Sequence, residues 1–471
     1  MTGTWATFGA DLHLDLAAVT GVRGLRAALT ESLREAARTG RLGPGTRLPS
    51  SRSLAADLGI ARNTVAEAYG ELVAEGWLTA RQGSGTRVAA RARPRRPAAA
   101  APPLRPPARR GPSYSLVPGS PDLGAFPRAG WLAAARRAVN AAPNEAFGYQ
   151  ADARGRPELR EALAGYLARA RGVYADPERI VLCAGFAHAL MLLGRTLREG
   201  RSREVAVEGY SLDFHREILA KAGLRTRPLW VDGAGARTGD LAGLGPRVGA
   251  VLLTPAHQFP TGVALTPQRR AAAVDWARTT GGLILEDDYD GEFRYDRQSI
   301  GALQGLDPDR VVYLGTASKS LAPGLRMGWM VVPPEWLDRV LEAKGRSDWS
   351  SSALDQLTLA EFLTSGAYDR HVRGMRLHYR RRRDELVAAV AGRVPVSGIA
   401  AGLHAVLDLP EGAERTTLQA AAWQGLALEG LGRYRHPASA MPPREALVVG
   451  YGTPSGSAWT PTLAALATTL P

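Results

Sequence analysis

One segment of this chain, residues 90–112, is unsuited to a folded core. Its 23 positions hold seven arginines, seven prolines, seven alanines and no acidic residue. Proline interrupts helices and sheet ladders, and the segment has little apolar surface to bury. We therefore expect a semi-extended basic linker that divides the 471 residues into a front domain, residues 12–89, and a back domain, residues 113–471.

The basic charge is concentrated before the back domain. Residues 1–112 carry 17 arginines and 8 acids, a net charge of +9, whereas residues 113–471 carry 42 basic residues and 37 acids, a net charge of +5. Such an imbalance favours a polyanionic partner for the front of the chain. A solubility role, together with a base composition that favours arginine codons, would explain the charge equally well.

Membrane and secretion signals are not expected from this sequence. No run of about 18 apolar residues is present to form a transmembrane helix, and the N-terminus does not have the pattern of a secretory signal. Cys183 is the single cysteine, which excludes an internal disulfide. The reducing cytoplasm is the predicted compartment.

The front domain shows three helical segments followed by a hairpin. Apolar residues at helical spacing predict a first helix within residues 17–38, a second over 52–58 that Ser50 or Ser51 can cap, and a third over 61–76. The third helix would turn Val65, Ala68, Tyr69 and Leu72 inward. Two short strands around Gly83 follow. This order predicts a helix-turn-helix fold whose third helix enters the major groove of DNA.

The start of the third helix carries Arg62, Asn63 and Thr64. Arginine can bind guanine edges, asparagine can pair with adenine, and threonine can reach a phosphate or a thymine methyl group. The same residues could also be solvated or capping residues of an ordinary three-helix bundle.

The whole stretch resembles the winged helix-turn-helix domain of the GntR family of bacterial transcription regulators. The motifs that carry the resemblance are LPSSR, the Arg-Asn-Thr-Val helix start, AEGWL and GSGT. The resemblance implies DNA contacts from Arg52, Arg62, Asn63 and Thr64, with Gly83 at the tip of the wing. Ala61 departs from the family, which usually has a capping side chain at that position.

Three stretches of the back domain can carry chemistry. In "RIVLCAGFAHALMLL", an apolar strand, residues 180–182, leads through Gly185 and Phe186 into a helix. Backbone amides at a helix start favour a phosphate group. The same strand-glycine-helix order is also common in α/β proteins that bind nothing there.

The second stretch, "GGLILEDDYDGEF", has a short buried strand, residues 283–285. Four acidic residues and Tyr289 follow it at positions 286–290. Ligands collect at the carboxyl ends of strands in open α/β sheets. The acids could bind a divalent metal, form a solvated turn, or supply one carboxylate to a protonated ring nitrogen beside the hydroxyl of Tyr289.

The third stretch, "LGTASKSLAPGLRMGW", contains Lys319, one of only three lysines among 59 basic residues. Arginine cannot replace lysine as an imine-forming amine, because guanidinium stays protonated. Arg326, seven positions later, can bind a phosphate with two hydrogen bonds. An ordinary surface lysine is the alternative.

These parts match the requirements of pyridoxal 5'-phosphate: a lysine for the Schiff base, a carboxylate for the pyridinium nitrogen, and a phosphate site. The back domain resembles a fold-type I aminotransferase, an α/β fold. A GntR-type winged helix joined to it resembles the MocR/GabR group of regulators, on the motifs TPAHQFPTG, EDDYDGEFRY, SKSLAPGLRMGW and AGLHAVLDL.

The resemblance assigns each cofactor contact to a residue of this chain. Lys319 would form the aldimine, Asp287 would pair with the ring nitrogen, and Tyr289 would donate to the ring hydroxyl. The phosphate would bind Ser318, Arg326 and the amides at Gly185 and Phe186, while Tyr210 would stack on the ring. No metal site is implied.

The residues expected around the substrate depart from the aminotransferase pattern. Phe259 stands where Asn-Pro-Thr-Gly would begin, and Glu208-Gly209-Tyr210 replaces the usual Glu-Asp-Pro-Gly-Tyr. Ala187 and His188 take positions where the group often has glutamines. No arginine stands near the C-terminus where aminotransferases bind the substrate carboxylate.

The sequence thus predicts a cytoplasmic, DNA-binding transcription regulator, not an enzyme, that binds pyridoxal phosphate and senses that cofactor or an amine or amino acid effector. The resemblance implies a head-to-tail homodimer on a double-stranded DNA operator, with no membrane partner. Two alternatives remain: an active aminotransferase with a vestigial front domain, and a regulator whose back domain only dimerises.

Overall fold

The computed structural model describes residues 22–81, 85–90, 112–149, 152–200, 202–295, 300–345 and 352–471. The chain divides into two compact units, Met1–Arg109 and Arg110–Pro471, and the division falls inside the predicted linker. Most of that linker and the wing-tip residue Gly83 lie outside the described residues, so the predicted domain bounds stay predictions. No described helix combines the length and the apolarity needed to cross a membrane.

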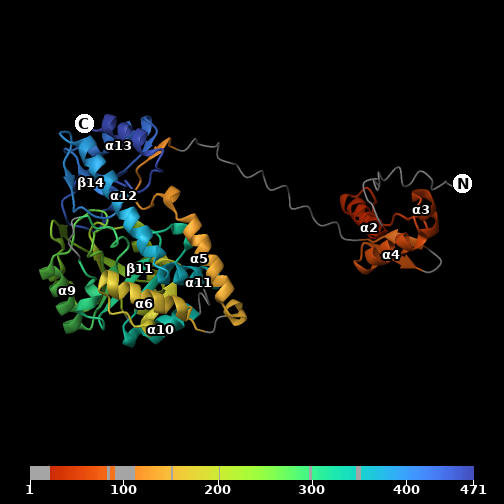
Figure 1. Ribbon diagram of the computed structural model, residues 1–471, viewed down its shortest axis with the longest axis horizontal. Helices are drawn as coiled ribbons and strands as arrows, with labels where there is room; N and C mark the ends of the chain where they lie inside the picture. The colour runs from red at the N-terminus through yellow and green to blue at the C-terminus, as the bar shows by residue number, and fades with distance from the viewer. Residues whose placement is uncertain are drawn as a thin grey trace. The chain divides into compact units, whose positions relative to one another are not determined.

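The front unit is the expected three-helix fold with a hairpin (Figure 1). Its elements are α2 (Val22–Thr39), α3 (Ser51–Leu58), α4 (Arg62–Ala74), β1 (Leu78–Arg81) and β2 (Gly85–Val88), with β1 and β2 antiparallel. The four residues predicted to face inward from α4 are all buried: Val65, Ala68, Tyr69 and Leu72.

The caps of the front-unit helices explain where they begin and end. The Ser50 hydroxyl accepts a hydrogen bond from the Ser53 amide, which settles the cap of α3 on Ser50. Gly59 ends α3 with φ of 65°, a left-handed conformation that glycine adopts without strain. Ala61 precedes α4 with no side-chain cap, as its alanine side chain requires.

A seven-stranded sheet forms the centre of the back unit, in the order β4-β12-β11-β10-β9-β5-β6. Only β12 runs antiparallel to its neighbours. The strands are β4 (Ile180–Cys183), β5 (Glu204–Glu208), β6 (Arg225–Leu229), β9 (Val248–Leu253), β10 (Leu283–Asp287), β11 (Val311–Thr316) and β12 (Gly328–Val331).

Helices cover both faces of this sheet. They are α5 (Arg128–Ala141), α6 (Pro157–Arg171), α7 (Phe186–Glu199), α8 (Asp213–Lys221), α9 (Pro267–Thr280), α10 (Pro334–Gly345) and α11 (Ala353–Thr364). In β10, Leu283 and Leu285 pack into the core with α7 and α10, whereas Ile284 packs into the core with α9. Because both faces are buried, the strands read as continuous apolar runs.

A smaller C-terminal layer follows the long helix α12 (Ala367–Val390), which runs between the two layers in Figure 1. Its sheet has the order β13-β14-β17-β16. The elements are β13 (Val396–Ser397), β14 (Ala405–Asp408), α13 (Ala413–Trp423), β16 (Glu429–Gly430), β17 (Ala446–Val449) and α14 (Trp459–Thr469). Two small pairs complete the unit: β3 (Tyr114–Ser115) with β15 (Leu426–Ala427), and β7 (Val231–Asp232) with β8 (Gly235–Ala236).

Candidate cofactor site and DNA-binding surface

A cavity of about 460 Å³ lies where four neighbouring parallel strands end. Strands β5, β10 and β11 contribute their last residues Glu208, Asp287 and Thr316, and Thr254 follows β9 directly. The other polar lining residues are Ser211, His215, Tyr289, Ser318, Lys319, Arg326, His404, Glu429, Arg433 and Tyr434. The second and third motifs of the sequence therefore meet at one edge of the sheet, as parallel strands require.

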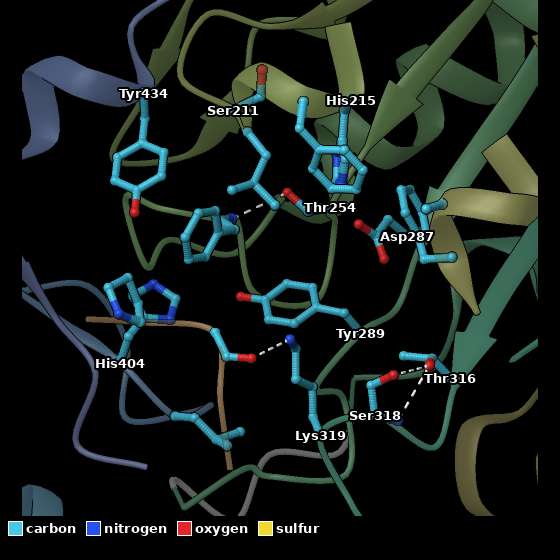
Figure 2. Close-up of a pocket in the computed structure, with 18 of the residues that line it drawn as sticks. Ser211, His215, Thr254, Asp287, Tyr289, Thr316, Ser318, Lys319, His404 and Tyr434 are labelled. Carbon is cyan, nitrogen blue, oxygen red and sulfur yellow. Dashed lines mark hydrogen bonds between the residues drawn. The ribbon is translucent and has the colours of Figure 1, made fainter. Parts of the chain in front are cut away.

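Lys319 lies in the turn after β11 and points into this cavity (Figure 2). Its Nζ donates a hydrogen bond to the carbonyl oxygen of Gly119 at 2.5 Å. Burial lowers the pKa of Lys319, while the charges of Asp287 and Asp290 oppose that shift. A lowered pKa increases the neutral fraction of the amine, which is the nucleophilic form.

Asp287 ends β10 and is only 6 % exposed. Its Oδ1 atom is buried and has no hydrogen-bond partner among the described residues. Burial, and next the charge of Asp288, raise the pKa of Asp287 well above its ordinary value, and Lys319 opposes the shift. A buried carboxylate without a partner is costly, so this position is suited to a cationic group brought by a ligand.

The residues predicted to bind the phosphate group of the cofactor lie around Gly185 and Arg326. Gly185 precedes α7 with φ of 86°, and a Cβ atom there would lie 3.4 Å from the Arg326 guanidinium. That guanidinium donates to the Ala184 carbonyl oxygen. Ser318 Oγ lies beside Thr316 Oγ1 at 2.9 Å, and Phe186 lines the cavity. A helix start, a hydroxyl and a guanidinium are groups that could hold an anion together.

Tyr289 lies between Asp287 and a buried histidine. Its hydroxyl is 3.3 Å from His257 Nδ1, and the same nitrogen is 2.8 Å from Asp290 Oδ2. Burial, reinforced by the Asp290 charge, raises the pKa of Tyr289 well above its ordinary value, so the hydroxyl stays protonated and can donate.

The structure places Tyr210 away from the cavity, which corrects the stacking role predicted for it. Gly209 turns tightly against the Leu229 carbonyl oxygen, where a Cβ atom would lie at 2.7 Å. This turn carries Tyr210 into the core, where its hydroxyl accepts a hydrogen bond from the Arg444 amide. The shortened Glu208-Gly209-Tyr210 segment explains the difference.

His215 is one of the rings that line the cavity. It packs against Phe186 and Phe214, with ring centroids 4.6 and 4.7 Å away. Burial lowers the pKa of His215 to about 3, so the imidazole is neutral at physiological pH. Sequence reasoning missed this residue because its position depends on the turn at Gly209.

Arg433 and Glu208 are two further lining residues that the sequence did not indicate. Arg433 forms an ion pair with Glu429, whose other oxygen accepts from the Tyr434 hydroxyl. Glu208 accepts hydrogen bonds from Thr254 and Gln258, and its burial raises its pKa to about 7. Arg433 belongs to no motif recognised in the sequence, and Glu208 was noted only as the first residue of the Glu208-Gly209-Tyr210 segment.

In the front unit, Arg52, Arg62 and Asn63 are exposed, on α3 and at the start of α4. Thr64 differs, because its side chain packs inside the unit and the residue is 8 % exposed. The geometry therefore supports DNA contacts from the first three residues and argues against a side-chain contact from Thr64.

Known families match both units. Residues 25–88 match the family "Bacterial regulatory proteins, gntR family", and residues 123–435 match "Aminotransferase class I and II". The probable rhizopine catabolism regulatory protein MocR of Rhizobium meliloti is 33% identical over 452 residues, covering 90% of this chain and 89% of its own. This chain is a MocR-type transcription regulator.

A second regulator and a solved aminotransferase structure also match most of this chain. The HTH-type pyridoxine biosynthesis transcriptional regulator PdxR of Corynebacterium glutamicum is 34% identical over 416 residues, covering 86% of this chain and 88% of its own. An archaeal alanine:glyoxylate aminotransferase of known structure has a TM-score of 0.68 and 28% identity, and the match covers 75% of this regulator and 90% of the enzyme. This MocR-type regulator therefore joins a GntR-type DNA-binding domain to a fold-type I aminotransferase domain.

Proposed function

We propose that the back domain of this regulator binds pyridoxal 5'-phosphate and that either this cofactor itself, or an amine or amino acid effector that acts at it, changes operator binding. The observation that carries the proposal is the unpartnered, buried Oδ1 of Asp287, which faces the same cavity as Lys319 and Arg326. The cavity thus offers the Arg326 guanidinium to a phosphate group and the Asp287 carboxylate to a protonated pyridine nitrogen.

The residues divide the binding between them. Lys319 would hold the cofactor covalently through Nζ, and Asp287 would pair with the ring nitrogen. Tyr289 would donate to the ring oxygen, and the neutral imidazole of His215 would cover one face of the ring. Arg326, Ser318 and the helix start at Gly185 and Phe186 would bind the phosphate.

Bound pyridoxal phosphate supplies a carbonyl-derived carbon that exchanges reversibly between primary amines, which makes an effector amine a competitor of Lys319. Arg433 is the cavity cation left for an effector carboxylate. Its side chain is 57% exposed, so its ion pair with Glu429 contributes little stability. The Tyr434 hydroxyl would keep Glu429 partnered after the exchange.

Coupling to DNA requires two arrangements of the protein with different effector affinities. We infer a head-to-tail homodimer that presents two recognition helices to paired half-sites of an operator. Effector exchange at Lys319 would then shift the balance between arrangements that fit the operator differently.

Reductive trapping tests the cofactor assignment directly. Full-length protein incubated with pyridoxal phosphate is treated with borohydride, digested and analysed by mass spectrometry. A phosphopyridoxyl group on the peptide that contains Lys319 is expected. Modification spread over Lys221 and Lys344, or none, would contradict the assignment. Turnover with amino acid and keto acid would instead indicate an active aminotransferase.

A further inference from the structure

Three sequence motifs meet behind Tyr289, at a place that the cofactor contacts do not use. TPAHQFPTG contributes His257, EDDYDGEFRY contributes Asp290, and AGLHAVLDL contributes Gly402 and His404. His257 and Asp290 belong to the layer of the large sheet, while Gly402 and His404 lead into β14 of the C-terminal layer. Gly402 has φ of 70°, and a Cβ atom there would lie 2.3 Å from both His257 Nδ1 and Asp290 Oδ2.

The His257–Asp290 pair is sealed from solvent. Both side chains are 2% exposed, and the Nδ1–Oδ2 distance is 2.8 Å. His404 packs on the His257 ring with centroids 4.7 Å apart, and its own Nε2 lies 3.1 Å from the Pro260 carbonyl oxygen. His257 Nε2 is buried without a hydrogen-bond partner among the described residues.

The hydrogen-bond geometry selects where the imidazole proton lies. Asp290 Oδ2 is an acceptor, so the 2.8 Å contact places a proton on His257 Nδ1. A protonated Nδ1 has no lone pair left to accept from the Tyr289 hydroxyl at 3.3 Å. Asp290 also lies close enough to Tyr289 for a side-chain hydrogen bond. Because the Nδ1 proton of His257 occupies the Oδ2 atom of Asp290, His257 competes with Tyr289 for that carboxylate and favours an acceptor on the cavity side for the Tyr289 proton.

Phe259 increases the importance of the Tyr289 hydroxyl as a hydrogen-bond donor in the cavity. Its aromatic ring lines the cavity and meets the Tyr289 ring edge-on, with ring centroids 6.1 Å apart. Because the Phe259 side chain has no hydrogen-bond donor, Tyr289 would be the residue that donates to the ring oxygen of the cofactor.

We propose that His257, held by Asp290, is a positioning residue that directs the hydroxyl proton of Tyr289 into the cofactor cavity. This inference rests on the proposed binding of pyridoxal phosphate. Other titratable groups near the pair are Glu208, Asp287, Lys319, His404, Tyr295 and Tyr451. Because all of these remain in the variants below, differences between variants report on the pair itself.

The test is a pH titration of the visible absorption of full-length protein loaded with pyridoxal phosphate. A proton donated to the ring oxygen stabilises the deprotonated form of the bound cofactor, so loss of the donor moves the midpoint to higher pH. Asp290→Asn and His257→Phe should each raise the midpoint by about one pH unit. In the first, the carboxylate no longer holds the imidazole proton on Nδ1, so the proton can move to Nε2 and Nδ1 can accept from Tyr289. In the second, Asp290 loses its imidazole donor and can accept more strongly from Tyr289.

Conservative and control variants separate positioning from packing. His257→Asn puts an amide nitrogen near the place of Nδ1, where it can donate to Asp290, and should keep the midpoint close to that of the wild type. His436→Asn removes another buried histidine, whose ring bonds Thr226, and should leave the midpoint unchanged. On a Tyr289→Phe background, Asp290→Asn should produce no further shift.

The three substitutions at His257 and Asp290 differ in how strongly they disturb packing. At least one of them is therefore expected to give a folded protein that binds the cofactor. Unmoved midpoints in Asp290→Asn and His257→Phe would overturn the inference, as would an equal shift on the Tyr289→Phe background. A wild-type protein without visible absorption would overturn the proposed cofactor as well, which distinguishes the two failures.

Discussion

The Nζ atom of Lys319 lies 2.5 Å from the carbonyl oxygen of Gly119, which joins the turn after β11 to a segment 200 residues earlier in the chain. This contact holds the amine at the cavity, facing the buried carboxylate of Asp287. Burial at the same place lowers the pKa of Lys319. The position of this lysine is therefore set in part by a segment far away in the sequence, and its lowered pKa increases the neutral, nucleophilic fraction of the amine.

Lys319→Ala should abolish the covalent attachment of pyridoxal phosphate, because Lys221 and Lys344 lie outside the cavity lining. Cofactor could still bind reversibly through Arg326 and Asp287. Visible absorption after gel filtration measures the attachment. Lys221→Ala, at an exposed position, is the matched control and should behave as wild type. Absorption that survives gel filtration in Lys319→Ala would refute the assignment.

Arg326→Ala should weaken cofactor binding by roughly 10- to 100-fold, because a charge-assisted bond to phosphate is lost at a position where Gly185 leaves room for it. Equilibrium dialysis with pyridoxal phosphate gives the affinity. Arg203→Ala, at an exposed position directly before β5, controls for loss of one positive charge. Equal affinities in the two variants would remove Arg326 from the phosphate site.

Glu208→Gln should stabilise the cofactor-free protein in a pH-dependent way. Burial raises the pKa of Glu208 from 4.5 to about 7, so the folded protein keeps this proton to higher pH than the unfolded chain does. Raising the pH from about 4.5 to 7 therefore ionises the unfolded chain first and lowers stability by about 1–3 kcal/mol, a cost that glutamine avoids.

Calorimetric unfolding of the back domain at several pH values measures this effect. The advantage of Glu208→Gln should grow across the window and level off above it, while exposed Glu161→Gln should show no such trend. A constant difference at all pH values would mean that Glu208 is already ionised throughout.

Arg62→Ala should weaken binding to the specific operator by roughly 1–3 kcal/mol if this exposed residue reads a base edge. Cofactor absorption should not change, because Arg62 belongs to the other unit. Fluorescence anisotropy with operator and random DNA measures the effect, and Arg38→Ala on the exposed side of α2 is the control. Equal losses on both DNAs would make Arg62 a phosphate contact.

Much of the fold was predictable because its signals are local. Apolar runs predicted β4 and β10, and the serine residues before α3 predicted where that helix begins. β10 nevertheless extends through Glu286 and Asp287, two positions beyond the predicted strand, because β11 continues to pair with it. Burial on both faces of the sheet overrides the polar character of those side chains.

The site was predictable only where its residues follow strands in short motifs, as Lys319, Asp287, Tyr289 and Arg326 do. His215 reaches the cavity from the first turn of α8 and Arg433 from the C-terminal layer, and no local pattern marks such positions. Tyr210 shows the converse, because a motif-based assignment fails when two residues are missing from the turn that would have positioned it.

The central claim is that the cofactor site controls DNA binding, and operator titration tests it most directly. Operator affinity and DNA bending are measured for cofactor-free protein, for protein loaded with pyridoxal phosphate, and for loaded protein with a panel of amines and amino acids, with solution mass determined in parallel. The account predicts a dimer whose affinity or bending changes with cofactor or with at least one amine, and a Lys319→Ala protein that no longer responds to amines. A monomer in every state, or identical affinity and bending whatever occupies the cavity, would contradict it.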